Sequence, residues 1–115
     1  MRSPLGDKVR IQHILDAITE IENYLDRVDY ESFASNSEKR FATIKQIEII
    51  GEACNAITPE TKDANQEIPW AAIKGFRNIS IHECFGVNTR IVLDIAQYDL
   101  PPMKAVLEEI LKTCG

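Results

Sequence analysis

The sequence predicts an all-α fold: a single-domain antiparallel helical bundle of about four to five main helices, spanning residues 1–115. Apolar residues recur every three or four positions along most of the chain, as they do on one face of a helix. No segment alternates apolar and polar residues for long enough to form a strand. A chain of 115 residues fits one domain and can bury a core without disulfides or a metal ion.

The first helix is predicted over about residues 7–28, where one stripe of isoleucine, leucine and valine runs along a single face. Asp7 has the side chain of a good N-cap and is expected to begin this helix. Residues 29–36, D-Y-E-S-F-A-S-N, are short and polar with two aromatic side chains. They are expected to form a connector or a single helical turn.

The second helix is predicted to start at S-N-S-E, in which Ser35 and Glu38 have the spacing of a capping box. It should run to about Ile57, and its apolar face is unusually wide, which favours a central position in the bundle. Thr58 followed by Pro59 is typical of a cap with proline at the first helical position. A short helical segment should therefore begin there.

Three further helical segments are predicted in the second half of the chain. The first begins at Pro69 and ends near Gly86, a residue type common just after a helix. The next carries the apolar residues of 87–98, and D-L-P-P at 99–102 is expected to break it. The two prolines suit the first turn of a last helix, which carries the apolar residues of 103–111.

Composition narrows the possible functions. The net charge of -5 argues against broad electrostatic capture of nucleic acid. No apolar run approaches the roughly 20 residues of a membrane span, and the start lacks the features of a secretory signal, so we expect a cytoplasmic protein without membrane contact. Cys54, Cys84 and Cys114 form no C-x-x-C pair, so we expect reduced thiols, Cys54 as a small core residue, and no zinc site.

The stretch R-N-I-S-I-H-E-C-F-G, residues 77–86, places Arg77 five residues before His82 in an otherwise apolar segment. Histidine can move a proton near neutral pH, and arginine can bind a phosphate and stabilise transition-state charge. The 2′-hydroxyl of RNA can act as an internal nucleophile, so such a site needs no metal. By residue type alone the signal is weak, because a bare R-x4-H occurs often by chance, and two surface residues on a core helix are the favoured interpretation.

Three sequence pieces together resemble the HepT family of the HEPN superfamily. They are I-I-G-E-A at 49–53, I-P-W at 68–70 and R-N-I-S-I-H-E at 77–83, and the resemblance extends from about residue 7 to 112. It implies a helical homodimer that acts as a metal-independent ribonuclease through an R-x4-6-H-x-Y motif. It also implies a toxin encoded beside a small nucleotidyltransferase antitoxin of the MntA type, which attaches AMP to the motif tyrosine.

Carried over by position, Arg77 would bind the scissile phosphate and His82 would transfer the proton, with Asn78 in support and no cofactor or metal. Cys84 stands where the family motif has the tyrosine that receives AMP. An alternative therefore stays open: a catalytically weak or inactive helical module that binds a nucleotide or a nucleotidyltransferase. A purely structural helical dimer is the third reading.

Overall fold

The computed structural model describes residues 4–75 and 89–113, in which every regular element is a helix and there is no strand. The elements in chain order are α1 (Pro4–Tyr24), α2 (Tyr30–Ser35), α3 (Ser37–Asn55), α4 (Pro59–Ala64), α5 (Trp70–Lys74), α6 (Thr89–Asp94), the π-helical turn η3 (Ile95–Asp99) and α7 (Leu100–Thr113). The predicted all-α class is confirmed. Within the described ranges, no helix combines the length and apolar character that a bilayer crossing requires.

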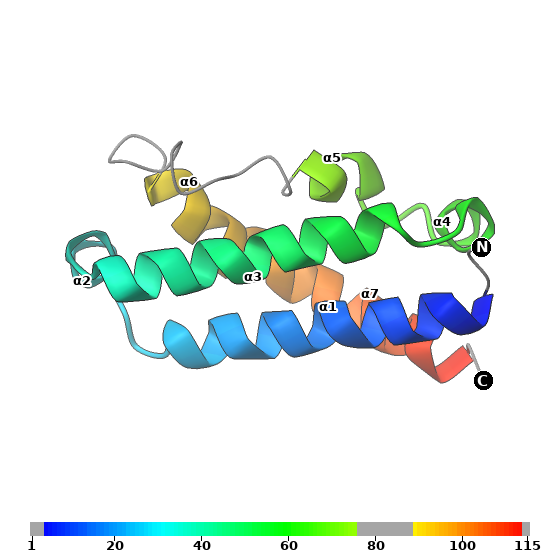
Figure 1. Cartoon of the computed structure of the whole chain (residues 1–115), viewed down its shortest axis with the longest axis horizontal. Coiled ribbons are helices and arrows are strands. Elements are labelled where there is room, and N and C mark those ends of the chain that lie inside the picture. The colour runs from blue at the N-terminus through cyan, green and yellow to red at the C-terminus, as the bar shows by residue number, and fades with distance from the viewer. Residues whose placement is uncertain (1–3, 76–88, 114–115) are drawn as a thin grey trace.

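The antiparallel pair of α1 and α3 is the main structural unit (Figure 1). The apolar stripe of each helix turns inward, and α7 contacts α1 through the same core. The fully buried side chains of this core are mostly isoleucines from the two long helices, together with Phe33 of α2: Ile11, Ile14, Ile18, Ile21, Ile44, Ile47 and Ile50. Burial of these side chains is the main force that holds the helices together.

The connection between α1 and α3 follows the prediction of a single short helical turn. Arg27 takes a left-handed conformation with φ 60° just after α1, and the chain then enters α2. The Asp29 side chain caps α2 by accepting a hydrogen bond from the Ser32 N–H at 2.8 Å.

The predicted start of α3 is wrong by one residue. Asn36, not Ser35, caps the helix, and its side chain accepts a hydrogen bond from the Lys39 N–H at 3.0 Å. Ser35 still belongs to α2, where its hydroxyl donates back to the Glu31 carbonyl at 2.9 Å. Only Asn36 has the extended backbone that an N-cap needs, so only its side chain can reach the first turn.

Asp7 does not cap α1 as predicted, because α1 begins at Pro4. Asp7 is instead fully buried, and its carboxylate accepts hydrogen bonds from the Thr58 N–H at 2.9 Å, the Thr58 hydroxyl at 2.5 Å and the Thr61 hydroxyl at 2.6 Å. Thr58 caps α4 and Pro59 follows at its first position, as predicted. One buried carboxylate therefore fastens the beginning of α1 to the beginning of α4.

The predicted break at residues 99–102 is wrong. Helices α6 and α7 are continuous through η3, in which the Leu100 N–H bonds to the Ile95 carbonyl, one residue further back than in an α-helix. Pro101 and Pro102 carry no N–H and crowd the preceding turn, and the wider π-helical turn accommodates them. Both prolines lie in the first turn of α7, as predicted.

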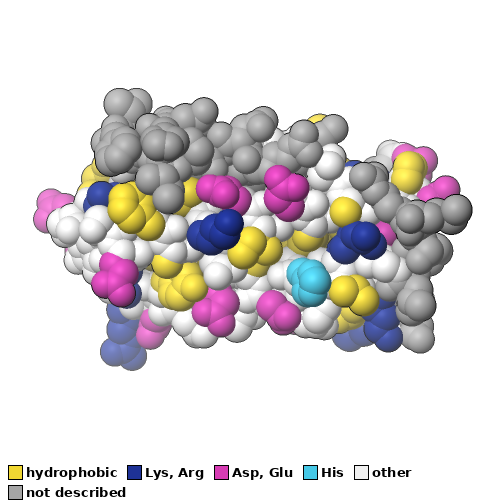
Figure 2. All heavy atoms as spheres, in the orientation of Figure 1, with side chains coloured by type: hydrophobic (Ala, Val, Ile, Leu, Met, Phe, Trp, Pro, Cys, Tyr) yellow, Lys and Arg dark blue, Asp and Glu magenta, His cyan; other side chains and the backbone are white. Residues whose placement is uncertain are grey.

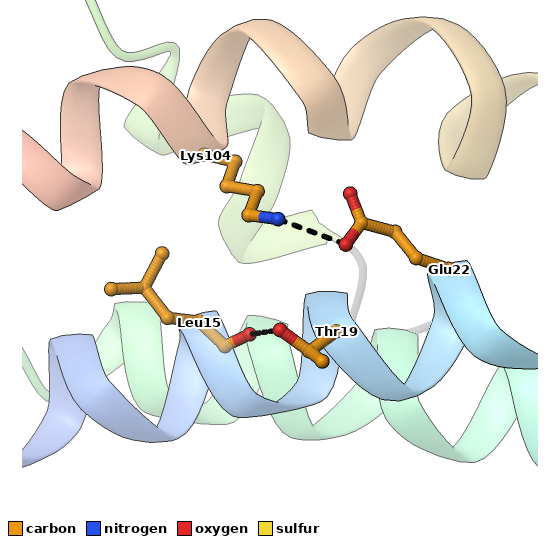
Figure 3. Close-up of polar contacts among 4 residues, drawn as sticks. All are labelled: Leu15, Thr19, Glu22 and Lys104. Carbon is orange, nitrogen blue, oxygen red and sulfur yellow. Dashed lines mark hydrogen bonds and ion pairs between the residues drawn. The ribbon is translucent and has the colours of Figure 1, made fainter.

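Helices α1 and α7 are also joined by a polar contact at the edge of the core (Figure 3). The Lys104 ammonium of α7 lies 2.9 Å from a carboxylate oxygen of Glu22 in α1. One turn earlier in α1, the Thr19 hydroxyl donates to the Leu15 carbonyl at 3.1 Å. The ion pair is partly exposed, so it contributes far less than the buried isoleucines.

Candidate functional site

The four residues singled out from the sequence, Arg77, Asn78, His82 and Cys84, lie in segment 76–88, outside the described residues. The predicted continuation of the third helix to Gly86 also lies there. The structure does describe the two helices that hold the ends of this segment and the surfaces nearby. The candidate site is built from them.

The incoming end of the segment is held by α5. Ile73 of α5 is buried at 2% exposure, and α5 packs on α3. Trp70 is half-buried against the core, and its indole N–H donates to the Asn65 carbonyl at 3.0 Å. Cys54 of α3 is fully buried, as predicted, with its Sγ 3.8 Å from the Trp70 carbonyl oxygen.

The outgoing end is held by α6. Thr89, Val92 and Leu93 are buried, so the first turns of this helix are fixed against the core. The Arg90 guanidinium lies 5.2 Å from the centre of the Tyr30 ring, and its Nε lies 3.3 Å from the Asp94 carboxylate. The two helices that flank the segment with the motif, α5 and α6, both contact α3 (Figure 1).

The face formed by α1 and α3 carries an open groove of about 680 Å³, which we call the α1–α3 groove. Figure 2 shows this face, with apolar side chains between charges of both signs and the histidine in cyan. Three residues of the I-I-G-E-A stretch contribute to it, namely Ile49, Glu52 and Ala53. The other lining residues are Gly6, Val9, Arg10, His13, Lys45 and Glu48.

The charges of the α1–α3 groove are balanced, with two basic side chains and two carboxylates. Its floor is partly apolar, since Val9 is 52% exposed beside the half-buried Ile49 and Ala53. Sequence reasoning did not find this groove. The sequence feature that could have indicated it is the wide apolar face of α3. This face is wider than the core can cover, so its edge stays open to solvent.

At one end of the groove, Arg10 also acts on Asp7. Burial raises the pKa of the Asp7 carboxyl, but hydrogen bonds from Thr58 and Thr61 and the nearby positive charge of Arg10 lower it by more. The net pKa lies below the ordinary value of 3.8. Asp7 is therefore a charged structural group near neutral pH, and it has no proton to give to a reaction.

The described residues alone do not form a set of catalytic groups. His13, on the exposed side of α1, is one of the chain's two histidines, and the other is His82. Over residues 4–75 and 89–113, no three His, Cys, Asp or Glu side chains lie close enough together to hold a metal ion. The α1–α3 groove, which His13 lines, can contact a partner.

Comparison with known proteins identifies the family. The family model described as "Ribonuclease HepT-like" matches residues 14–110. The chain is 33% identical over 105 residues to a "Putative RNase" of Methanocaldococcus jannaschii, covering 91% of this chain and 90% of that protein. It is also 33% identical over 102 residues to a "Probable ribonuclease HepT" of Thermococcus cleftensis, covering 89% of this chain and 93% of the relative. No solved structure matches significantly. The chain belongs to the HepT-like ribonuclease family.

Proposed function

We propose that this chain is a metal-independent endoribonuclease that acts as the toxin of a HepT/MntA-type toxin–antitoxin pair. The observation that carries the proposal is the family match over residues 14–110, within which Arg77 and His82 keep the motif spacing. The two relatives, named as a "Putative RNase" and a "Probable ribonuclease HepT", support the same reaction class. In this proposal residues 1–115 act as one HepT-like domain.

The reaction would use the RNA's own 2′-hydroxyl as nucleophile. His82 takes the proton from that hydroxyl as the 2′-oxygen attacks phosphorus, and the bond from phosphorus to the 5′-oxygen breaks. Arg77 binds the non-bridging phosphate oxygens and stabilises the charge that builds on them. The proton that His82 took then passes to the departing 5′-oxygen, so the products end in a 2′,3′-cyclic phosphate and a 5′-hydroxyl.

Asn78 and Cys84 have supporting places in this proposal. Asn78, which directly follows the arginine, orients the phosphate or the imidazole through its amide. Cys84 has no phenol that could accept AMP, so control by modification of the motif tyrosine does not carry over to this position. An antitoxin of the nucleotidyltransferase type would have to inhibit this chain by binding it or by modifying another residue.

The proposed active species is a homodimer, with two copies of the motif lining one RNA groove. The α1–α3 groove supports this, because its two basic and two acidic side chains can pair with each other across a two-fold axis. Light scattering at micromolar concentration should report twice the chain mass of 13.0 kDa. A species of 13.0 kDa alone would count against a dimer in which two copies of the motif line one RNA groove.

The alternative is a module that binds a nucleotide or a nucleotidyltransferase without cleaving RNA. Two observations favour it: Cys84 in place of the motif tyrosine and the net charge of -5. Intact Arg77 and His82 favour the nuclease, and the two readings differ in one measurable property, which is cleavage.

Cleavage of a labelled transfer RNA pool in EDTA by the purified protein tests the proposal. We expect products with 2′,3′-cyclic phosphate ends, and a loss of at least about 100-fold in His82→Ala, the usual range for a general acid or base. Glu20→Ala is the control, because it truncates an exposed side chain of α1 outside the α1–α3 groove and should leave cleavage unchanged.

Equal cleavage by wild type and His82→Ala would overturn the role of the histidine. No cleavage by folded wild type would favour the binding module, and Cys84→Tyr would then show whether the missing phenol is the cause.

A further inference from the structure

A second surface hollow, which we call the α5–α7 hollow, lies between residues 67–73 and the helix that runs from η3 into α7. It has a volume of about 360 Å³. Ile73 and Met103, exposed by 2% and 5%, form its floor. Its walls are apolar and partly open to solvent: Pro69, Ala72, Tyr98, Pro102 and Val106. It shares no lining residue with the α1–α3 groove.

The π-helical turn sets the position of Tyr98 at this hollow. A π-helical turn holds one more residue than an α-helical turn, so it changes which side of the helix the next side chains occupy. Tyr98 lies within η3 and is 65% exposed, the largest fraction among the exposed large hydrophobic side chains of the described residues. An aromatic side chain left open beside an apolar hollow is typical of an interaction surface.

The rim of the hollow is acidic. Glu67 and Asp99 both line it and are exposed, and none of the described side chains that line it is basic. In the part of the chain that the structure describes, neither carboxylate belongs to an ion pair. Phosphate groups of RNA would be repelled here, whereas an apolar side chain flanked by a cation would be matched in both shape and charge.

We propose that the α5–α7 hollow is a docking site for a partner protein that inserts an apolar side chain and places a lysine or arginine against Glu67 and Asp99. The inference does not depend on nuclease activity. It does place the partner beside a functionally important stretch, because Ile73 in the floor precedes Arg77 by four residues. A protein bound here contacts the helix that leads into the motif.

Nuclear magnetic resonance titration of the full chain tests the docking site. The probe is a synthetic alanine-based helical peptide with two leucines one turn apart and an arginine on either side. The control peptide has glutamate in place of each arginine. We expect the arginine peptide to cause saturable shifts at Ala72, Ile73, Tyr98 and Met103, and the glutamate peptide to cause none.

Two variants sharpen the test. The double variant Glu67→Lys/Asp99→Lys should weaken binding of the arginine peptide by at least about tenfold. This is the scale of a charge pair across an interface. Glu20→Lys with Asp63→Lys changes the net charge equally at exposed positions outside the hollow and should bind as wild type does. Circular dichroism confirms that both double variants fold.

Three results would overturn the proposal. The first is an absence of saturable shifts with the arginine peptide. The second is equal binding of the two peptides, which would remove the role of the acidic rim. The third is a shift of the same resonances by a single-stranded oligouridylate, which would make the hollow an RNA contact.

Discussion

Helix α1 is held in the bundle by two kinds of contact. Along its length it packs through buried side chains such as Ile14 and Ile18, each exposed by 1%. Near its two ends it is held by polar contacts: Asp7 binds the threonines at the start of α4, and Glu22 pairs with Lys104 of α7. The apolar contacts recur every turn, whereas each polar contact is a single connection between distant parts of the chain.

The apolar contacts stabilise the bundle, whereas the polar contacts position its parts. An apolar side chain gains from burial against any apolar neighbour, so a continuous stripe is robust and strongly stabilising. A polar contact depends on one partner and on whether water can replace it. The fully buried Asp7 should therefore matter far more than the partly exposed pair of Glu22 and Lys104.

The largest loss of stability is predicted for a substitution in the apolar core between α1 and α3. Ile47 lies in the middle of α3 with 0% exposure. Ile47→Ala should lower the free energy of unfolding by about 3 kcal/mol, because it removes buried methyl groups and leaves a cavity. Urea denaturation followed by circular dichroism measures the loss.

The matched control makes the same substitution on the surface. Ile91 of α6 is 53% exposed, so Ile91→Ala should cost less than about 0.5 kcal/mol. Similar losses in the free energy of unfolding at the two positions would mean that the core between α1 and α3 does not dominate stability.

The next effect is at Asp7. Asp7→Asn keeps the shape but offers only one accepting oxygen, so one or two hydrogen bonds with the threonines are lost. The free energy of unfolding at pH 7 should fall by about 2 kcal/mol. The substitution should also change the response to acid.

The sign of that response follows from the lowered pKa of Asp7. Its contribution is present above the unfolded pKa of about 3.9 and is lost as pH falls through the lower folded pKa. Stability measured from pH 6 to 2.5 should therefore fall less steeply in Asp7→Asn than in wild type. Parallel curves for the two proteins would contradict a charged, hydrogen-bonded Asp7.

A smaller effect is expected at the start of α3, where the sequence and the structure disagree on the cap. Asn36→Ala should cost about 1 kcal/mol, since the Lys39 N–H loses its acceptor. Ser35→Ala should cost less than half as much, because the Ser35 hydroxyl only bonds within α2. The reverse order in thermal denaturation would restore Ser35 as the cap.

Most of the fold follows from the helical period alone. The stripes of isoleucine and leucine predict the long helices to within a few residues, because each buried side chain is one step of three or four from the next. The choice between Ser35 and Asn36 was missed because both side chains can cap. Only the backbone conformation after α2 decides between them. The uninterrupted helix through Pro101 and Pro102 was missed because a π-helical turn has no clear sequence signature.

The candidate site also has a part that the sequence could predict and a part that it could not. The motif from Arg77 to His82 is local in sequence, so spacing and resemblance could point to it, and its roles stay predictions. The α1–α3 groove and the α5–α7 hollow bring together side chains from segments that are 25 or more positions apart in the sequence. No local pattern predicts such surfaces, because they form where two helices leave side chains that the core does not cover.

The smallest expected effect is at the ion pair of Glu22 and Lys104. The hydrogen bond to Glu22 raises the pKa of Lys104 above its ordinary value of 10.5, so the ammonium stays charged in ordinary buffers. The two side chains are 46% and 30% exposed, and water and salt therefore screen their attraction. A double-mutant cycle with Lys104→Met and Glu22→Gln should give a coupling free energy below about 1 kcal/mol, decreasing further in 1 M sodium chloride. A coupling as large as the loss at Asp7, or one that salt leaves unchanged, would mean that the pair is effectively buried. The two ends of α1 would then be held by polar contacts of equal strength.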